Sequence, residues 1–373
     1  MHALYDWLQV IGVILADTHE QAVAAARKVR VDYEDLPAII SIDDAIAHNS
    51  FFPHHHEIKS GDMEAQRSLA DVHISGEGKI GGQEHFYLET NCTVVLPSDN
   101  GHLEVHSSTQ NCSKTQHLCA SVCGLPDSKV VAKCKRMGGA FGGKESRSVF
   151  IAVTAALGAH LLKRPVSINV ERDVDMSITG QRHSFQYKYK AGMSSSSGEL
   201  KYLEVQLYSN AGFSLDLSQA VMDRALFHVD NVYKWPAYHV RGSVCRTNQP
   251  SHTAFRGFGG PQGMIVTETV LQHFAEVTTA FSLEQIKRSN MYAEGERTPF
   301  GVTLESFIAP TLWDRMMDIA SVSERKQGIV QFNQANRWRK RGLAVTATKF
   351  GINFTALNFM NKVSCCCYCC CQQ

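Results

Sequence analysis

Hydrophobic positions recur with two different periods along this 373-residue chain, which predicts a mixture of strands and helices. Alternation of apolar and polar residues predicts strands, most clearly at His102 to Ser107, Phe185 to Ala191 and Leu200 to Ser209. A longer apolar-periodic run from Asn111 to Cys123 predicts a helix that Gly124 ends. Because strand–helix–strand units alternate with antiparallel pieces, the pattern favours an α/β fold of the mixed α+β kind.

Further elements follow from the same two periods. The other predicted strands are Val10 to Leu15, Val29 to Tyr33, Ala38 to Ile40, Lys129 to Lys135 and Val166 to Val170. The other long predicted helices are Ser146 to Leu162, Asp216 to Phe227, Pro261 to about Phe274, Leu283 to Tyr292 and about Leu312 to Trp338. Thr18 and Ser41 are predicted to cap two short helices near the start of the chain.

Residues 49–62 break both periods because Asn, Ser, Pro and Gly cluster there, and we interpret them as a linker. This stretch contains a triplet, His54 to His56, that invites a metal site. Adjacent side chains do not face the same way on a helix or a strand, so we favour a solvated loop for the triplet.

The composition narrows the possible partners. Lys and Arg number 37 against 36 Asp and Glu, so the net charge of +1 gives no electrostatic case for nucleic acid or an acidic membrane. No apolar run approaches the roughly 20 residues that a membrane span needs. With 44% hydrophobic and 20% charged residues, the composition is that of an ordinary globular protein.

The 12 cysteines fall into two groups. Six lie in one run, Cys365 to Cys371, and the other six form no C-x2-C pair that would support zinc or iron–sulfur ligation. Cys112, Cys119 and Cys123 share one face of a predicted helix, and we interpret them as small buried hydrophobic residues in a reducing compartment. Metal binding is an alternative for the terminal run.

A Gly-rich segment from Gly138 to Glu145 lies between a predicted strand and a predicted helix. It fits G-x4-G-K, but Glu145 stands where a phosphate-binding loop needs Ser or Thr for magnesium, which argues against a nucleotide site. Exposed N–H groups at the start of a helix would still suit an anion or oxo group. The alternative is a tight turn between a strand and a helix.

Two more segments add candidate chemistry. Thr253 to Gln262 is a second Gly-rich stretch, and its Arg256 and two aromatic rings suit a planar, electron-rich ligand. In Gly81 to Tyr87, a Gly pair precedes Gln83, whose neutral amide can hydrogen-bond an uncharged acceptor.

Five segments together resemble signatures of the xanthine dehydrogenase and aldehyde oxidase family of molybdenum hydroxylases. They are GGQEHFYLET at 81–90, RMGGAFGGKESRS at 136–148, DVDMSITGQRH at 173–183, RALFHVDN at 224–231 and TAFRGFGGPQ at 253–262. The resemblance implies the end of an α/β-hammerhead unit at 1–48, the linker at 49–62, a first molybdopterin-binding domain at 63–305 and the start of a second at 306–357. From Ala356 onward the resemblance fades, and we interpret residues 358–373, with the Cys run, as a tail that is foreign to the family and arises from a gene-model error.

The resemblance also implies roles for individual residues. Molybdenum–molybdopterin is the implied cofactor, and the residues matched to its pocket are Gln83, Phe141, Gly142 and Arg256. Of these, Gln83, Phe141 and Arg256 would surround the metal without ligating it directly. The residues matched to substrate contacts are Glu145, Arg224, Phe258, Phe354 and Thr355. The family's catalytic glutamate is not expected in this chain, and its FAD and 2Fe–2S clusters are expected to bind outside it.

The implied activity is hydroxylation of a purine, from hypoxanthine to xanthine to urate. Glu145 and Arg224 favour this over the aldehyde oxidase alternative, because aldehyde oxidases generally carry apolar residues at those positions. An alternative of another class is a non-catalytic remnant that acts only in binding. The resemblance also implies a homodimer, and a cytoplasmic or peroxisomal location.

Overall fold

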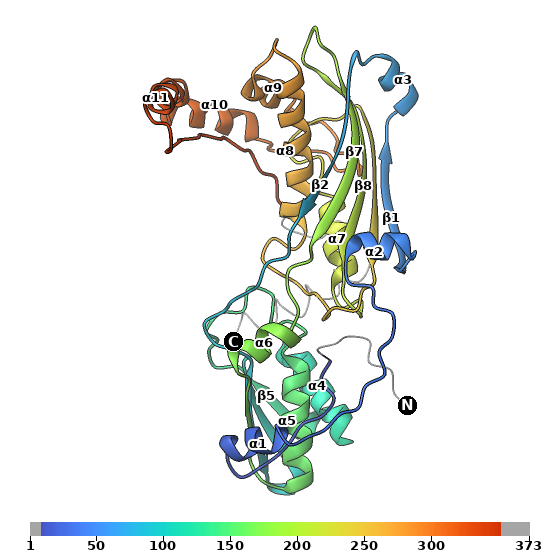
Figure 1. The fold of residues 1–373 in the computed structure, drawn as a ribbon, viewed down its shortest axis with the longest axis vertical. Coiled ribbons are helices and arrows are strands. Elements are labelled where there is room, and N and C mark those ends of the chain that lie inside the picture. The colour runs from blue at the N-terminus through green and yellow to red at the C-terminus, as the bar shows by residue number, and fades with distance from the viewer. Residues whose placement is uncertain (1–8, 352–373) are drawn as a thin grey trace.

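The computed structural model describes residues 9–351, which fold into two lobes, each built on one β-sheet (Figure 1). The lobe drawn uppermost contains a five-stranded sheet covered by helices, and an arm of two helices extends from it. The lower lobe contains a four-stranded sheet. This arrangement confirms the predicted mixed α/β fold class.

The larger sheet has the strand order β1-β9-β8-β7-β2. Its strands are β1 (Phe51–Ser60), β2 (Val72–Ile80), β7 (Phe185–Met193), β8 (Leu200–Asn210) and β9 (Ala237–Cys245). β8 and β9 run parallel, and the other neighbouring pairs run antiparallel. The two strands that come first in the sequence therefore lie at the two opposite edges of the sheet.

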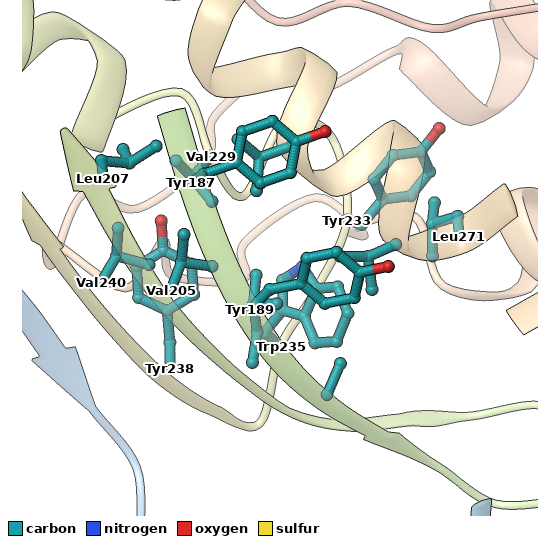
Figure 2. Packing of buried hydrophobic residues seen from close by; sticks show 14 of the residues in the cluster. Tyr187, Tyr189, Val205, Leu207, Val229, Tyr233, Trp235, Tyr238, Val240 and Leu271 are labelled. Carbon is teal, nitrogen blue, oxygen red and sulfur yellow. The ribbon is translucent and has the colours of Figure 1, made fainter. Parts of the chain in front are cut away.

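Helices α7 (Ser218–Leu226), α8 (Gly260–Val277) and α9 (Leu283–Ser289) lie on one side of this sheet, and the short α3 (Met63–Ser68) joins β1 to β2. The main core fills the space between the sheet and the helices. Figure 2 shows aromatic rings packed among aliphatic side chains: Tyr187 and Tyr189 of β7 lie near Tyr233 and Trp235, which come from the segment before β9. Burial of these large rings together with the aliphatic residues stabilises this lobe.

The smaller sheet has the strand order β5-β4-β3-β6 and is built from β3 (Cys92–Ser98), β4 (His102–Ser107), β5 (Val130–Lys133) and β6 (Val166–Asn169). Helices α4 (Cys112–Cys123) and α5 (Val149–Leu162) pack together and on this sheet. Four fully buried alanines of α5 let the helix approach the strands closely: Ala152, Ala155, Ala156 and Ala159.

The remaining helices connect these units or flank them. They are α1 (His19–Ala26), α2 (Ile42–Ala47), α6 (Arg172–Ile178), α10 (Ala309–Ile319) and α11 (Val322–Ala335), with 3-10 turns at Asp99–Gly101 and Asp127–Lys129. The last two helices form the arm (Figure 1).

Several local predictions are confirmed. Thr18 caps α1 and Ser41 caps α2, each in a capping box. Gly124 ends α4 in the left-handed conformation, with φ of 65°. The predicted helix from Leu312 to Trp338 is instead two helices, because Ser321 adopts a left-handed φ of 45° between them.

The predicted linker at 49–62 is wrong, because most of it forms the edge strand β1. The His54–His56 triplet lies on this strand rather than in a loop, and the His56 Nδ1 bonds to the Asp223 carboxylate of α7. The pairing partner of β1 is β9, about 190 residues later, so no local sequence pattern could indicate it.

Three short predicted strands are also wrong: Val10 to Leu15, Val29 to Tyr33 and Ala38 to Ile40 have no strand structure. These segments are short apolar or alternating runs, but no neighbouring strand among the described residues supplies the backbone hydrogen bonds that a ladder needs.

Two of the three cysteines on the predicted helix face are buried, as expected. Cys119 and Cys123 are buried free thiols, and Cys112 is half-buried. The reducing compartment stays a prediction. Within residues 9–351 no three or more His, Cys, Asp or Glu side chains are grouped to hold a metal ion. The run from Cys365 to Cys371 lies outside the described residues.

Candidate functional site

The first Gly-rich loop, residues 138–145, follows β5 and adopts a strained backbone. Phe141 has a φ of 55° and Gly142 a φ of 100°, in the region that favours glycine. A Cβ atom at Gly142 would lie 2.7 Å from the carbonyl oxygen of Ala254. Only glycine therefore lets the two Gly-rich loops come this close.

Several backbone N–H groups of this loop are already bonded within the protein. Gly142 N and Lys144 N donate to the same Gln110 Oε1, at 3.0 and 3.2 Å, and Gly143 N donates to the Ala140 carbonyl at 2.8 Å. At these three positions the expectation of N–H groups free for an anion is therefore wrong. Gln110, which precedes α4, accepts from two of them.

Lys144 points into the protein and is completely buried. Its Nζ donates to the Glu89 carbonyl at 2.8 Å and to Ser108 Oγ at 2.7 Å, and it lies 3.2 Å from Glu89 Oε2. Burial alone would raise the pKa of Glu89, but bonds from Ser108, the Gly138 N–H and Lys144 outweigh it and lower that pKa to about 2. Because this lysine faces a carboxylate, it is not placed to bind a phosphate, which agrees with the argument against a nucleotide site.

The second Gly-rich loop, residues 253–259, is bonded directly to the first. Arg256 N donates to the Phe141 carbonyl at 2.9 Å. Asp216 connects the loops from the other side, because its Oδ2 accepts from Ser146 Oγ at 2.9 Å and from Thr253 Oγ1 at 2.6 Å. The two loops thus form one unit where the lobes meet.

The third segment joins this unit through Arg182. Gln83 and Arg182 form an isolated antiparallel bridge, and Arg182 Nε donates to Gln83 Oε1 at 2.9 Å. The Arg182 guanidinium also donates to the Arg256 carbonyl at 2.9 Å and lies 3.8 Å from the Phe255 ring centroid. One arginine therefore holds Gln83 next to the second Gly-rich loop.

Glu145 of the first Gly-rich loop carries a carboxyl in an unusual setting. Its carboxyl is half-buried and makes no ion pair with any described residue. Burial first, and then the nearby Asp216 carboxylate, raise the pKa of Glu145 to about 6. At neutral pH the group therefore loses or gains a proton at little cost.

Arg224 lies on α7 and is buried. Its Nη1 donates to the Gly351 carbonyl at 3.1 Å, and its guanidinium lies 5.0 Å from the Phe350 ring centroid. Burial lowers its pKa from the usual value. The second Gly-rich loop lies against the same helix, because a Cβ at Gly259 would contact the Val221 backbone, but Glu145 and Arg224 are not in direct contact.

The aromatic residues are only partly described. Phe258 is half-buried, has a left-handed φ of 49° and packs against the main core. Phe354 and Thr355 lie outside the described residues, so their predicted substrate contacts stay predictions.

The residues present fit a molybdopterin group. Arg182 occupies Gln83 Oε1, which leaves the Gln83 amide hydrogens for an oxo acceptor, and Gln83 and Arg256 are exposed. Phe141 is exposed beside them, and the buried Gly142 allows the close approach of the two loops, because Ala254 leaves no room for a side chain there. These four residues would hold the cofactor.

Sequence reasoning missed the residues that support this site. Arg182 and Lys144 lie inside the recognised motifs at 173–183 and 136–148, and their charge within those motifs was the available signal. The residues without such a signal are Gln110 and Asp216.

Comparisons with known proteins agree with this site. The family described as "Molybdopterin cofactor-binding domain" matches residues 44–291. The chain is 49% identical over 354 residues to "Xanthine dehydrogenase/oxidase" of Rattus norvegicus and 50% identical over 359 residues to "Xanthine dehydrogenase 1" of Arabidopsis thaliana. Each match covers 95% of this chain and 26% of the relative, so the chain spans about a quarter of those proteins' length.

Solved structures show the same fold. The aldehyde oxidoreductase of Desulfovibrio gigas matches with a TM-score of 0.75 at 25% identity, over 86% of this chain and 35% of that one. Quinoline 2-oxidoreductase of Pseudomonas putida 86 matches with a TM-score of 0.78 at 19% identity, over 86% of this chain and 42% of that one.

No helix of residues 9–351 is both long enough and apolar enough to cross a membrane. The match to the domain family covers most of the chain, and the relatives match nearly all of it. The chain therefore belongs to the molybdopterin cofactor-binding domain family and is a homologue of the xanthine dehydrogenases.

Proposed function

We propose that this chain forms part of the cofactor and substrate pocket of a molybdenum-dependent oxidoreductase that hydroxylates purines, from hypoxanthine to xanthine to urate. The observation that carries the proposal is the half-buried carboxyl of Glu145, whose pKa is raised to about 6. A carboxyl with that pKa is mostly ionised at neutral pH and accepts hydrogen bonds, and its minor protonated form can also donate one. Purine rings present donors and acceptors side by side, which a simple aldehyde does not.

Arg224 would supply the second contact. Attack on a purine carbon moves negative charge onto the ring, and a guanidinium aimed at a ring carbonyl stabilises that charge. Its burial keeps water away and strengthens the interaction. Preorganised donors of this kind are worth about 10²–10³-fold in rate. Aldehydes have no second carbonyl to gather the charge, so Arg224 would contribute little to their oxidation.

Gln83, Phe141, Gly142 and Arg256 would hold the cofactor, which when bound supplies the oxygen-transfer and redox chemistry. The Gln83 amide would donate a hydrogen bond whose direction is fixed by Arg182. FAD and 2Fe–2S clusters would bind parts of the enzyme outside this chain, and the enzyme would be a homodimer. Phe258, Phe354 and Thr355 would contact the substrate.

A chimera tests the proposal: this chain replaces the 354 matched residues of the rat relative. We expect the molybdenum-loaded chimera to oxidise xanthine. Arg224→Met should lower kcat/KM for xanthine by about 10²–10³-fold and leave kcat/KM for an aromatic aldehyde nearly unchanged. Glu145→Val should shift preference toward the aldehyde.

The matched control is Arg288→Met, which removes an arginine whose ion pair with Asp314 joins α9 to α10. It should alter neither substrate's kcat/KM per bound molybdenum. Equal losses on both substrates in Arg224→Met would contradict the purine contact. A fully loaded chimera that turns over only aldehydes would favour the aldehyde oxidase alternative, and one that turns over neither would favour the non-catalytic one.

A further inference from the structure

The motif at 224–231 ends in two buried polar residues that the pocket does not explain. Asp230 and Asn231 have no exposed surface. Both bond to residues 345–351, a segment without regular secondary structure that we call the strap. The strap is the last part of the chain before the positions matched to substrate contacts.

Side chains, rather than a neighbouring strand, bond the backbone of the strap. Lys287 Nζ donates to the Val345 carbonyl at 3.0 Å. Asn231 Nδ2 donates to the Ala347 carbonyl at 2.9 Å, and Asn231 Oδ1 accepts from Lys349 N at 3.1 Å. Every second residue of the strap is therefore hydrogen-bonded, as in a strand. The position of the strap, however, depends on side chains such as Lys287 and Asn231.

An ion pair fixes the middle of the strap. Lys349 Nζ lies 2.5 Å from Asp230 Oδ2, and Tyr292 OH donates to the same oxygen at 3.0 Å. The Asp230 side chain is fully buried and that of Lys349 is 16% exposed. Because separating such a pair leaves an uncompensated buried charge, the pair strongly favours one position of the strap.

The far end of the strap contacts Arg224. The Gly351 carbonyl accepts from Arg224, whose guanidinium also lies near the Phe350 ring. His228 Nδ1 donates to the Arg224 carbonyl at 2.7 Å and its Nε2 accepts from Gly351 N at 3.4 Å, so the ring is neutral. Burial, which lowers the pKa of His228 to about 4, agrees with this. A side chain at Gly260 would collide with Phe350, 2.7 Å away.

We propose that Asp230, Asn231 and Lys349 are positioning residues, which set the direction of the Arg224 guanidinium toward a purine through the strap. The inference rests on the proposed function. None of the three needs to touch substrate. Their effect on turnover passes through Arg224, so it should be specific for purines and should vanish when Arg224 is absent.

Hydrogen exchange of the 373-residue chain tests the anchoring independently of activity. Lys349→Met and Asp230→Asn should speed exchange of the peptide 345–351 by about 10-fold or more while leaving β8 unchanged. The control Lys326→Met removes the cation of the α11 ion pair with Glu284 and should change neither. Unchanged strap exchange in both anchor variants would overturn the proposal.

A double-mutant cycle in the chimera tests the route to Arg224. Lys349→Met should lower kcat/KM for xanthine by about 10-fold and spare the aldehyde, and it should have no further effect in the Arg224→Met background. A Lys349→Met loss that is equal for both substrates, or that persists without Arg224, would overturn positioning in favour of a purely structural role. If Arg224→Met itself lowers kcat/KM equally for both substrates, the proposed function is contradicted together with the positioning role. If only the positioning role is wrong, the loss in Arg224→Met stays specific for xanthine.

Discussion

Glu89→Gln probes the buried pair beneath the first Gly-rich loop. The substitution keeps the shape of the side chain but removes the charge that faces Lys144, a lysine with no exposed surface. Lys144 keeps its bonds to the Glu89 carbonyl and to Ser108. The measured decrease in the free energy of unfolding therefore reports mainly the loss of the Glu89 charge beside Lys144.

The magnitude follows from the pKa of Glu89, which the fold lowers from 4.5 to about 2. At about 1.4 kcal/mol per pKa unit, that shift corresponds to roughly 3 kcal/mol. The side chain is 35% exposed, so solvent screening reduces this to about 2 kcal/mol at pH 7. Because the folded pKa is the lower one, the contribution is complete above the unfolded pKa and is lost as pH falls from about 4.5 toward 2.

Urea unfolding followed by tryptophan fluorescence measures the effect at pH 7, 5 and 3. We expect Glu89→Gln to lower the free energy of unfolding by about 2 kcal/mol at pH 7 and by about 1 kcal/mol at pH 3. The control Glu104→Gln removes a carboxylate of similar exposure whose partner Lys133 is 48% exposed, and it should produce a much smaller change. A Glu89→Gln effect that is absent at pH 7, or equal at all three pH values, would refute the reasoning.

Other substitutions probe the rest of the site. Burial raises the pKa of Glu145 to about 6, so Glu145→Gln should stabilise the chain by up to about 2 kcal/mol at pH 8 and by nothing at pH 4; urea unfolding with the opposite pH trend would contradict this. Gly142→Ala should destabilise it by about 1–3 kcal/mol in the same assay, because the backbone φ is 100° and Ala254 blocks the new methyl group; an unchanged midpoint would count against the geometry. Arg182→Met frees Gln83 and should weaken cofactor retention about 10–100-fold, measured as molybdenum per chain; full retention would rule out the supporting role of Arg182.

The sequence was informative where structure depends on neighbours in the chain. The capping boxes at Thr18 and Ser41 each need only four consecutive residues, and both are present. The strand β1 was missed because its Pro and His residues favour a loop locally, whereas the backbone bonds of β9 decide the outcome. Tertiary pairing overrides local preference in this way throughout β-sheets.

The residues of the site also divide into those that a local motif reveals and those that only the fold brings together. The Gly-rich segments and the carboxyl of Glu145 could be found in the sequence because each is a local motif. Their supports could not, since Gln110 and Asp216 reach the loops only through the fold. Gln110 also explains why the N–H groups of Gly142 and Lys144, predicted to be free, are already bonded.

The strand order of the larger sheet has a consequence for how the chain is made. β1 and β2 leave the ribosome first but occupy opposite edges, and β1 has no partner until β9 is complete at Cys245. At typical rates of about 5–20 residues per second, β1 waits about 10–40 s for that partner. During this interval its backbone is an open strand edge that can pair with other nascent chains. The time spent in synthesis, rather than the stability of the finished sheet, is thus the period in which this lobe is most exposed to misassembly.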